Sequence, residues 1–213
     1  MFKIKCYNPR RDKILLSVLA CAISMYLAFS CTYFAGAAAS VRQDVVRLHV
    51  LANSDSTADQ ELKIKVRDAL LEQNTLLLTQ GVNKENAVEY FENSRDELLE
   101  AARSVIAESG FDYDVIMYID EEYFETRKYG DMTFPAGEYT ALKVIIGSGE
   151  GKNWWCVMFP PLCVPAADDV EIKNTTDGYL TESGSKIVNG GNKYIVKFKL
   201  LEMYEEIQNR IRS

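Results

Sequence analysis

The longest pattern along the chain is an apolar stretch near its N-terminus. Residues 14–34 contain no charged side chain; a basic segment precedes them and the small residues 35–39 follow. Basic, apolar and small segments in this order are typical of a secretory signal peptide. The apolar stretch is also long enough to cross a bilayer as a helix. We therefore expect residues 1–39 to be a signal peptide or an N-terminal membrane anchor, and the rest of the chain to be exported.

The next segments predict one strand followed by two helices. Residues 45–52 are rich in valine and leucine, which favours a strand. Ser56 and Asp59 then form a variant of the capping box that begins many helices. Apolar side chains spaced three and four residues apart predict a first helix from there to about residue 80, and a second helix over residues 83–110. Each helix is expected to bury one face.

The second half of the chain predicts mainly strands. Apolar and β-branched residues favour strands at 114–120, 123–128, 139–146 and 153–159. The glycine-rich residues 147–151 predict a hairpin between the last two of them.

The C-terminal region has a different character. Residues 164–192 are polar and glycine-rich, which predicts a flexible loop or tether. Apolar residues at helical spacing then predict a C-terminal helix over residues 193–213. The exported α+β domain is therefore expected to span residues 40–163. The predicted fold class is α+β: a mostly antiparallel sheet, two consecutive helices after the first strand, and a C-terminal helix.

Charge is divided unevenly along the chain. Residues 1–39 hold five basic side chains against one acidic one, a net charge of +4. Residues 40–213 have a net charge of −11, so the whole chain has −7. No basic stripe is available to neutralise phosphates, which argues against a nucleic-acid partner. Hydrophobic residues make up 47% and charged residues 26% of the chain, as is ordinary for a globular protein.

Two of the five cysteines belong to the exported part. Cys156 and Cys163 stand seven residues apart, and the other three precede residue 40. An isolated pair in an oxidising compartment predicts a disulfide. Two free, buried thiols are the alternative.

No credible catalytic, cofactor or metal set emerges from the sequence. His49 is the only histidine, and no glycine-rich nucleophile turn flanks Cys156 or Cys163, so a thiol-hydrolase dyad is disfavoured. The spacing of Asn53 and Asp55 does not fit a calcium loop. We therefore expect the protein not to be an enzyme and to have no catalytic, cofactor-binding or metal-binding residues.

Trp154 and Trp155 are the most informative aromatic pair. Neighbouring residues of a strand point to opposite faces of the sheet, so one ring can enter the core while the other is exposed or covered by a partner. The alternative is that helices cover both faces.

Two long stretches of the sequence resemble one known family. The first reads VRLHVLANSDS at residues 46–56 and DQELKIKVRDA at 59–69. The second reads FPAGEY at 134–139, ALKV at 141–144 and NWWCVMFPPLC at 153–163. Together they resemble the stage II sporulation protein R family of endospore-forming bacteria.

The resemblance implies a function that composition and spacing could not supply. Members of that family are secreted from the forespore into the space between forespore and mother cell. There they activate a membrane-embedded aspartic protease, which then processes the pro-form of the mother-cell sigma factor, sigma-E. The resemblance thus implies that protease as partner, with membrane contact through the N-terminal segment, either transient or as an anchor at residues 14–34.

Binding residues are not implied by the resemblance, so the candidates come from the residues themselves. Polar side chains around the first strand and helix start, and aromatic or charged side chains of the second stretch, could form either internal networks or a docking face. The partner-binding candidates are Arg47, His49, Asn53, Asp55, Gln60, Lys63, Arg67, Phe134, Glu138, Trp154 and Trp155. Two other functions stay open: a secreted hydrolase acting on cell wall, and a membrane-anchored structural domain.

Overall fold

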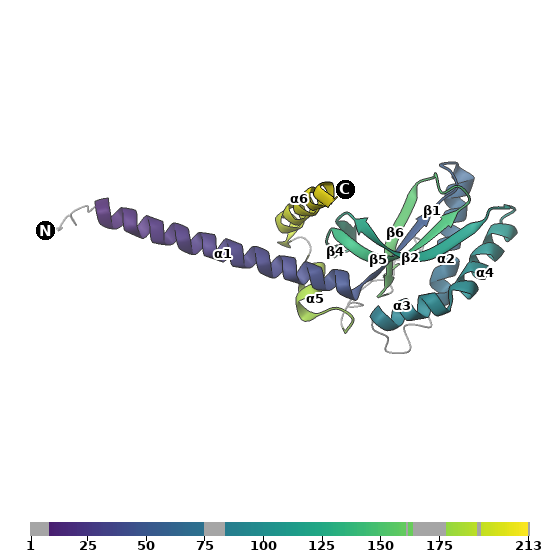
Figure 1. Ribbon diagram of the computed structural model, residues 1–213, viewed down its shortest axis with the longest axis horizontal. Coiled ribbons are helices and arrows are strands. Elements are labelled where there is room, and N and C mark those ends of the chain that lie inside the picture. The colour runs from purple at the N-terminus through teal and green to yellow at the C-terminus, as the bar shows by residue number, and fades with distance from the viewer. Residues whose placement is uncertain (1–8, 75–83, 161, 164–177, 191–192, 213) are drawn as a thin grey trace. The chain divides into compact units, whose positions relative to one another are not determined.

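The computed structural model describes residues 9–74, 84–160, 162–163, 178–190 and 193–212 (Figure 1). The chain divides into two compact units, Met1–Gly36 and Ala37–Ser213. The first consists of the N-terminal part of helix α1 (Pro9–Asp44). By length and composition this helix could cross a membrane, and a signal sequence would have the same properties.

The second unit contains the last turns of α1 followed by a mixture of strands and helices. In chain order these are β1 (Val46–Leu51), α2 (Thr57–Asn74), α3 (Lys84–Asn93), α4 (Arg95–Glu108), β2 (Val115–Phe124), β3 (Arg127–Tyr129), β4 (Met132–Phe134), β5 (Gly137–Ile146), β6 (Asn153–Phe159), α5 (Glu182–Asn189) and α6 (Ile195–Arg212).

The main sheet has the strand order β2-β5-β1-β6, and β3 and β4 form a separate two-stranded hairpin. β1 runs parallel to β5 and antiparallel to β6, while β2 and β5 are antiparallel. The predicted α+β class with a mostly antiparallel sheet is therefore confirmed. The predicted hairpin between residues 139–146 and 153–159 is wrong, because β1 lies between these two strands.

The loop that joins β5 to β6 shows why these strands are separated. It crosses the end of β1, where the backbone N–H of Gly151 donates to the carbonyl of Ala52 at 2.9 Å. On the side facing the helices, β1 buries Val46, Leu48 and Val50 completely. A strand buried on this scale gains most from a central position.

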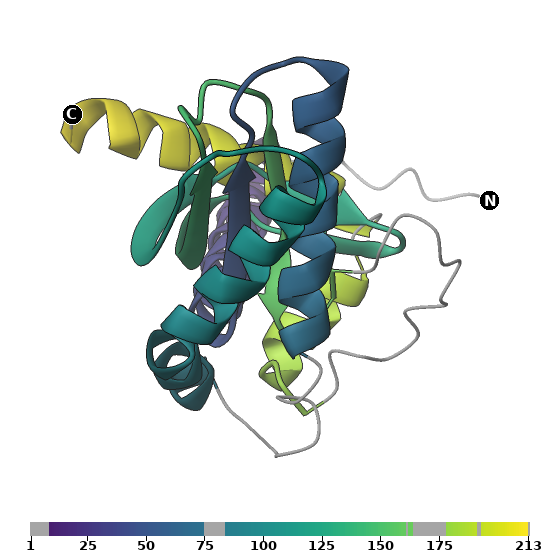
Figure 2. The ribbon, with the colours of Figure 1, turned by 90° about the vertical axis from the view of Figure 1, so that its right-hand side faces the viewer.

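Helices α2, α3 and α4 cover one face of this sheet (Figure 2). The apolar spacing predicted two helices, and it correctly identified the buried positions Leu62, Val66 and Leu70 of the first. The second predicted helix is in fact two, α3 and α4, which meet at Ser94. Neither glycine nor proline marks that junction, but Ser94 followed by Glu97 has the spacing of a capping box, a helix-start signal that the apolar spacing alone does not contain. The predicted extension of the first helix over residues 75–80 lies outside the described residues.

Two further expectations differ from the structure. The segments 114–120 and 123–128 were predicted as separate strands, but β2 is continuous and pairs with β5 over its whole length. The predicted tether at 164–192 contains helix α5. Thr181 caps α5 by accepting a hydrogen bond from the N–H of Gly184, and Ile187 and Val188 are buried. Two adjacent apolar residues amid polar ones were too short a signal for a helix. Residues 164–177 lie outside the described part of the chain.

Candidate partner-binding face

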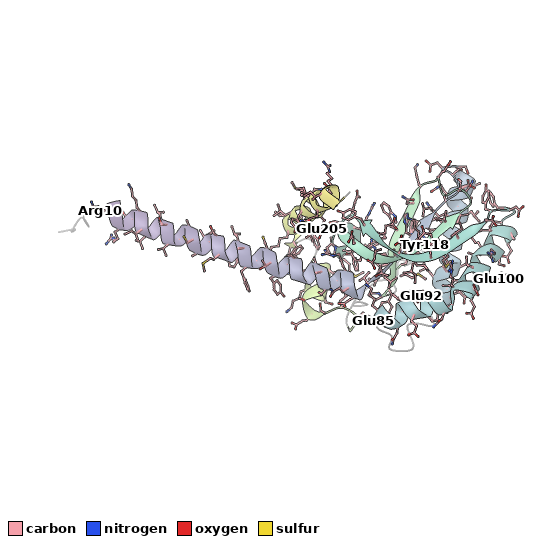
Figure 3. The ribbon with its side chains drawn as sticks, in the orientation of Figure 1. Arg10, Glu85, Glu92, Glu100, Tyr118 and Glu205 are labelled. Atoms are coloured by element: carbon pink, nitrogen blue, oxygen red, sulfur yellow. A yellow bond between two sulfur atoms is a disulfide. The ribbon has the colours of Figure 1, made fainter. Side chains whose placement is uncertain are left out.

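The second face of the sheet carries the side chains that point away from α2, α3 and α4. The strand register places them in rows across β2, β5, β1 and β6. One row is Ile116, Ile145, Leu51 and Asn153, and the next is Tyr118, Lys143, His49 and Trp155. We call these eight residues the open sheet face; Tyr118 is labelled in Figure 3. Ile116 is 54% exposed, which is high for a large apolar side chain in a sheet.

Arg47 occupies the next row and is completely buried. Its guanidinium carbon lies 4.5 Å from the centre of the Phe124 ring and 5.1 Å from that of Tyr139. The rings of Tyr129 and Phe134 complete an aromatic box around it. Burial lowers the pKa of Arg47 from its usual value. The box belongs to the folded interior and lies beside the open sheet face, at the end of the sheet where Arg47 stands.

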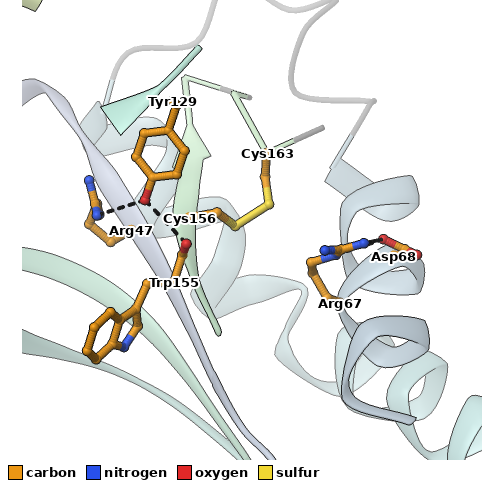
Figure 4. The surroundings of a disulfide bond; sticks show 7 residues. All are labelled: Arg47, Arg67, Asp68, Tyr129, Trp155, Cys156 and Cys163. Carbon is orange, nitrogen blue, oxygen red and sulfur yellow. Dashed lines mark hydrogen bonds and ion pairs between the residues drawn. A yellow bond between two sulfur atoms is a disulfide. The ribbon is translucent and has the colours of Figure 1, made fainter. Parts of the chain in front are cut away.

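Within the described part of the chain, one hydrogen bond anchors this arginine. Arg47 Nη2 donates to the hydroxyl of Tyr129 at 3.1 Å, and that hydroxyl donates to the carbonyl of Trp155 at 3.2 Å (Figure 4). Tyr129 comes from the β3–β4 hairpin, so the chain of hydrogen bonds fastens the hairpin to β1 and β6. Burial raises the pKa of Tyr129, which keeps the hydroxyl protonated and able to donate.

His49 and Glu122 form the central polar contact of the open sheet face. His49 Nδ1 lies 2.6 Å from Glu122 Oε2, and Lys143 Nζ lies 3.3 Å from Glu122 Oε1. A carboxylate can only accept, so Nδ1 carries the proton and donates. Nε2 is buried and has no hydrogen-bond partner among the described residues. The Trp155 ring packs edge-on against the imidazole at 5.5 Å.

The geometry does not assemble a nucleophile with this histidine. Cys156 pairs with Leu48 in the sheet, so its side chain points to the helix side, whereas His49 points to the open sheet face. The two tryptophans follow the same alternation, as the sequence predicts: Trp155 lies on the open sheet face and Trp154 on the helix side. Within the described residues, no group of three or more His, Cys, Asp and Glu side chains could hold a metal ion.

Four of the candidate residues instead connect two loops at the end of β1. Asn53 Oδ1 accepts from the N–H of Ser148 at 3.0 Å, and Asp55 Oδ1 accepts from the N–H of Lys152 at 2.7 Å. Lys63 Nζ donates to Gln60 Oε1 and to the carbonyl of Lys152. Burial lowers the pKa of Lys63. These contacts hold the β1–α2 turn against the β5–β6 loop, which is an internal network.

Arg67 and Trp154 lie together on the helix side at the edge strand. The guanidinium of Arg67 stands 4.3 Å from the centre of the Trp154 ring, and Nε donates to Asp68 at 2.8 Å. Nearby, Cys156 and Cys163 form a disulfide with their Cα atoms 5.5 Å apart (Figure 4). The disulfide closes the chain that follows β6 back onto that strand.

The two remaining candidates lie near β5. Phe134 is buried in the aromatic box. Glu138 is exposed and lines a polar groove of about 520 Å³ together with Arg42 and Glu205. Arg42 and Glu205 face each other there at 3.4 Å. The candidates predicted from the sequence therefore separate into the open sheet face, the aromatic box, an internal loop network, a cation–ring pair and a groove.

Comparison with known proteins assigns the chain to a family. The family model described as stage II sporulation protein R matches residues 42–169, which include the complete four-stranded sheet and α2, α3 and α4. The chain belongs to the stage II sporulation protein R family. A relative named "Stage II sporulation protein R" from Bacillus subtilis (strain 168) is 37% identical over 123 residues, covering 58% of this chain and 55% of that relative. The chain thus matches about half the length of this relative. No solved structure matches the chain.

Sequence reasoning missed most of the open sheet face. Among the family residues matched, Ile116, Tyr118, Glu122 and Lys143 were not candidates, although all four lie around His49 or in the neighbouring row. Because side chains alternate between the two faces of a strand, the sequence of residues 115–124 could have indicated that Ile116 and Tyr118 point away from the buried Val115 and Met117. Their proximity to His49 could not have been seen, because it depends on the strand order.

Proposed function

We propose that this chain is an exported sporulation signal that activates a membrane-embedded aspartic protease, which then processes the pro-form of the mother-cell sigma factor sigma-E. The observation that carries the proposal is the family match over residues 42–169. The apolar helix α1 supports export, since a signal peptide or an anchor would both have its properties. Neither requires an enzymatic activity of this chain.

The protease would contact the open sheet face. This surface combines the exposed Ile116 with aromatic side chains of Tyr118 and Trp155, and such residues contribute most to binding at protein interfaces. Asn53, as part of the loop network, would keep the face rigid without touching the partner.

Activation would follow from differential binding. A partner shifts a protease between two states only by as much as it prefers one of them. Moving a population from 1:99 to 99:1 takes a preference of about 10⁴-fold. A rigid face with little reorganisation on binding suits this role, because little ordering entropy opposes the contact.

The first experiment is deletion of the gene in its host. An immunoblot of the sigma-factor precursor during sporulation measures processing. We expect the precursor to accumulate, and expression of the full chain in the forespore to restore the mature form. Normal processing in the deletion strain would reject the proposed function.

A second experiment locates the contact. Ile116→Lys places a charge on the open sheet face, and we expect it to lower the rate of processing about tenfold. Glu100→Lys introduces the same side chain on α4, on the helical side of the sheet (Figure 3), and should leave processing unchanged. Equal processing by both variants, at equal protein level, would exclude the open sheet face as the docking surface.

A further inference from the structure

Helix α6 exposes a continuous apolar stripe. Its members stand 4, 7, 8, 11 and 15 residues after Val196, so at 3.6 residues per turn they fall within an arc of about 100°. They are Val196, Leu200, Met203, Tyr204, Ile207 and Ile211, and each is more than half exposed. A soluble surface helix normally turns such a stripe to the core. In α6 the core contacts come from another side of the helix, where Phe198 and Leu201 are buried.

Charges are sorted around this stripe. Lys199 and Arg210 lie along one edge by helical spacing, and Lys197 lies along the other. Two of the three acidic residues, Glu202 and Glu205, have largely buried side chains, whereas Glu206 is exposed. Glu202 pairs with Lys199 at 3.3 Å. Glu205 faces Arg42 at 3.4 Å, and burial together with Glu206 and its acidic neighbours raises the pKa of Tyr123 to about 12. An apolar stripe edged by lysine and arginine is the pattern of a helix that lies in the surface of an anionic bilayer.

The connection to the leader places α6 close to a membrane. The Arg42–Glu205 ion pair attaches α6 to the part of the chain that follows the apolar stretch. Arg42 stands eight residues after Phe34. Eight residues span about 12 Å as a helix and at most about 28 Å when extended. While residues 14–34 are in a bilayer, α6 therefore stays within reach of its surface.

We propose that α6 lies in the surface of the membrane that the N-terminal segment enters, with its apolar stripe in the boundary between headgroups and acyl chains. This membrane contact is additional to that of residues 14–34. After removal of a signal peptide, it would be the contact that retains the domain at the membrane. The inference rests on export and is independent of protease activation.

The test uses the full chain reconstituted into vesicles of phosphatidylethanolamine and phosphatidylglycerol. A genetically encoded fluorescent amino acid replaces Ile207, and lipids carrying a nitroxide near the headgroup quench it. Ile116 serves as the matched control position, because it is 54% exposed against 56% for Ile207 but lies on the sheet. We expect quenching at position 207 and little at position 116.

A stripe variant adds an independent readout. Leu200→Ser, tested with the fluorophore at position 207, should lower the ratio of docked to undocked helix about tenfold, because one leucine side chain no longer enters the bilayer. Equal quenching at positions 207 and 116, or none at 207, would overturn the proposal whatever the variant does. Quenching that disappears when the protein is diluted to one chain per vesicle would also overturn it, since the stripe would then bind a second copy.

Discussion

Arg47 is a buried cation with no carboxylate partner among the described residues, and replacing it by methionine tests how the aromatic box is stabilised. Its Nε and Nη1 atoms are buried without hydrogen-bond partners in the described part of the chain. Methionine is of similar length, adaptable and uncharged. The substitution therefore removes the charge while keeping the space between the rings filled.

The magnitude follows from contributions of opposite sign. Each buried donor without a partner costs about 1–3 kcal/mol. The contact with the Phe124 ring at 4.5 Å returns about 2 kcal/mol, and the charge-assisted bond to Tyr129 about 1.5–3 kcal/mol. These contributions nearly cancel, so Arg47→Met should lower the free energy of unfolding by less than about 1 kcal/mol, or raise it. Arg47→Ala empties the box and should lower it by about 3–4 kcal/mol.

Urea denaturation of residues 37–213, followed by circular dichroism, measures both variants. We expect the methionine variant to unfold near the wild-type midpoint and the alanine variant at a clearly lower urea concentration, with equal slopes. Arg47→Lys keeps the charge but loses the planar stacking, so it should be less stable than the methionine variant. A methionine variant as unstable as the alanine variant would refute the reasoning, because the charge itself would then contribute net stability.

Three further predictions concern the same domain. The double variant Cys156→Ser/Cys163→Ser should lose about 2.5 kcal/mol in urea denaturation, as expected for opening a loop of about eight residues, and reductant should have no effect on it. The Ser54 hydroxyl lowers the pKa of Asp59 below 3.8, so its stabilisation is complete above that value and is lost as the pH falls through the lowered pKa. Thermal melting of Asp59→Asn should accordingly change less between about pH 5 and about pH 2 than that of the wild type; parallel curves would contradict this. Gly151→Ala should lower stability by about 2 kcal/mol, since its Cβ would meet the backbone carbonyl of Ser54; an unchanged melting temperature would show that the loop can move aside.

The sequence pattern correctly predicted those features of the structure that depend only on residues close together in the chain. The stripe Leu62, Val66 and Leu70 is buried as its spacing predicts. Trp154 and Trp155 point to opposite faces because alternation is a property of any strand. Cys156 and Cys163, seven residues apart, are joined in the structure.

The candidate site was harder to predict because its residues come from distant segments. His49 contacts Glu122 across 73 positions of sequence. That contact requires β5 to lie between β1 and β2, whereas the hairpin expected from residues 147–151 placed β5 next to β6. Because one strand was assigned the wrong neighbour, the residues of the open sheet face could not be recognised as neighbours in space.

By itself, the sequence determined the apolar leader, the α+β class and the family, because each is written in local spacing or in contiguous motifs. Only the tertiary structure decided the strand order, the enclosure of Arg47 and the outward turn of the α6 stripe. Arg47 illustrates the reason: β1 pairs it with Ala141, and four rings from β2, the β3–β4 hairpin and β5 surround it. Whether a charged side chain is buried depends on which distant segments pack around it, and the residue spacing within one strand does not reveal those segments.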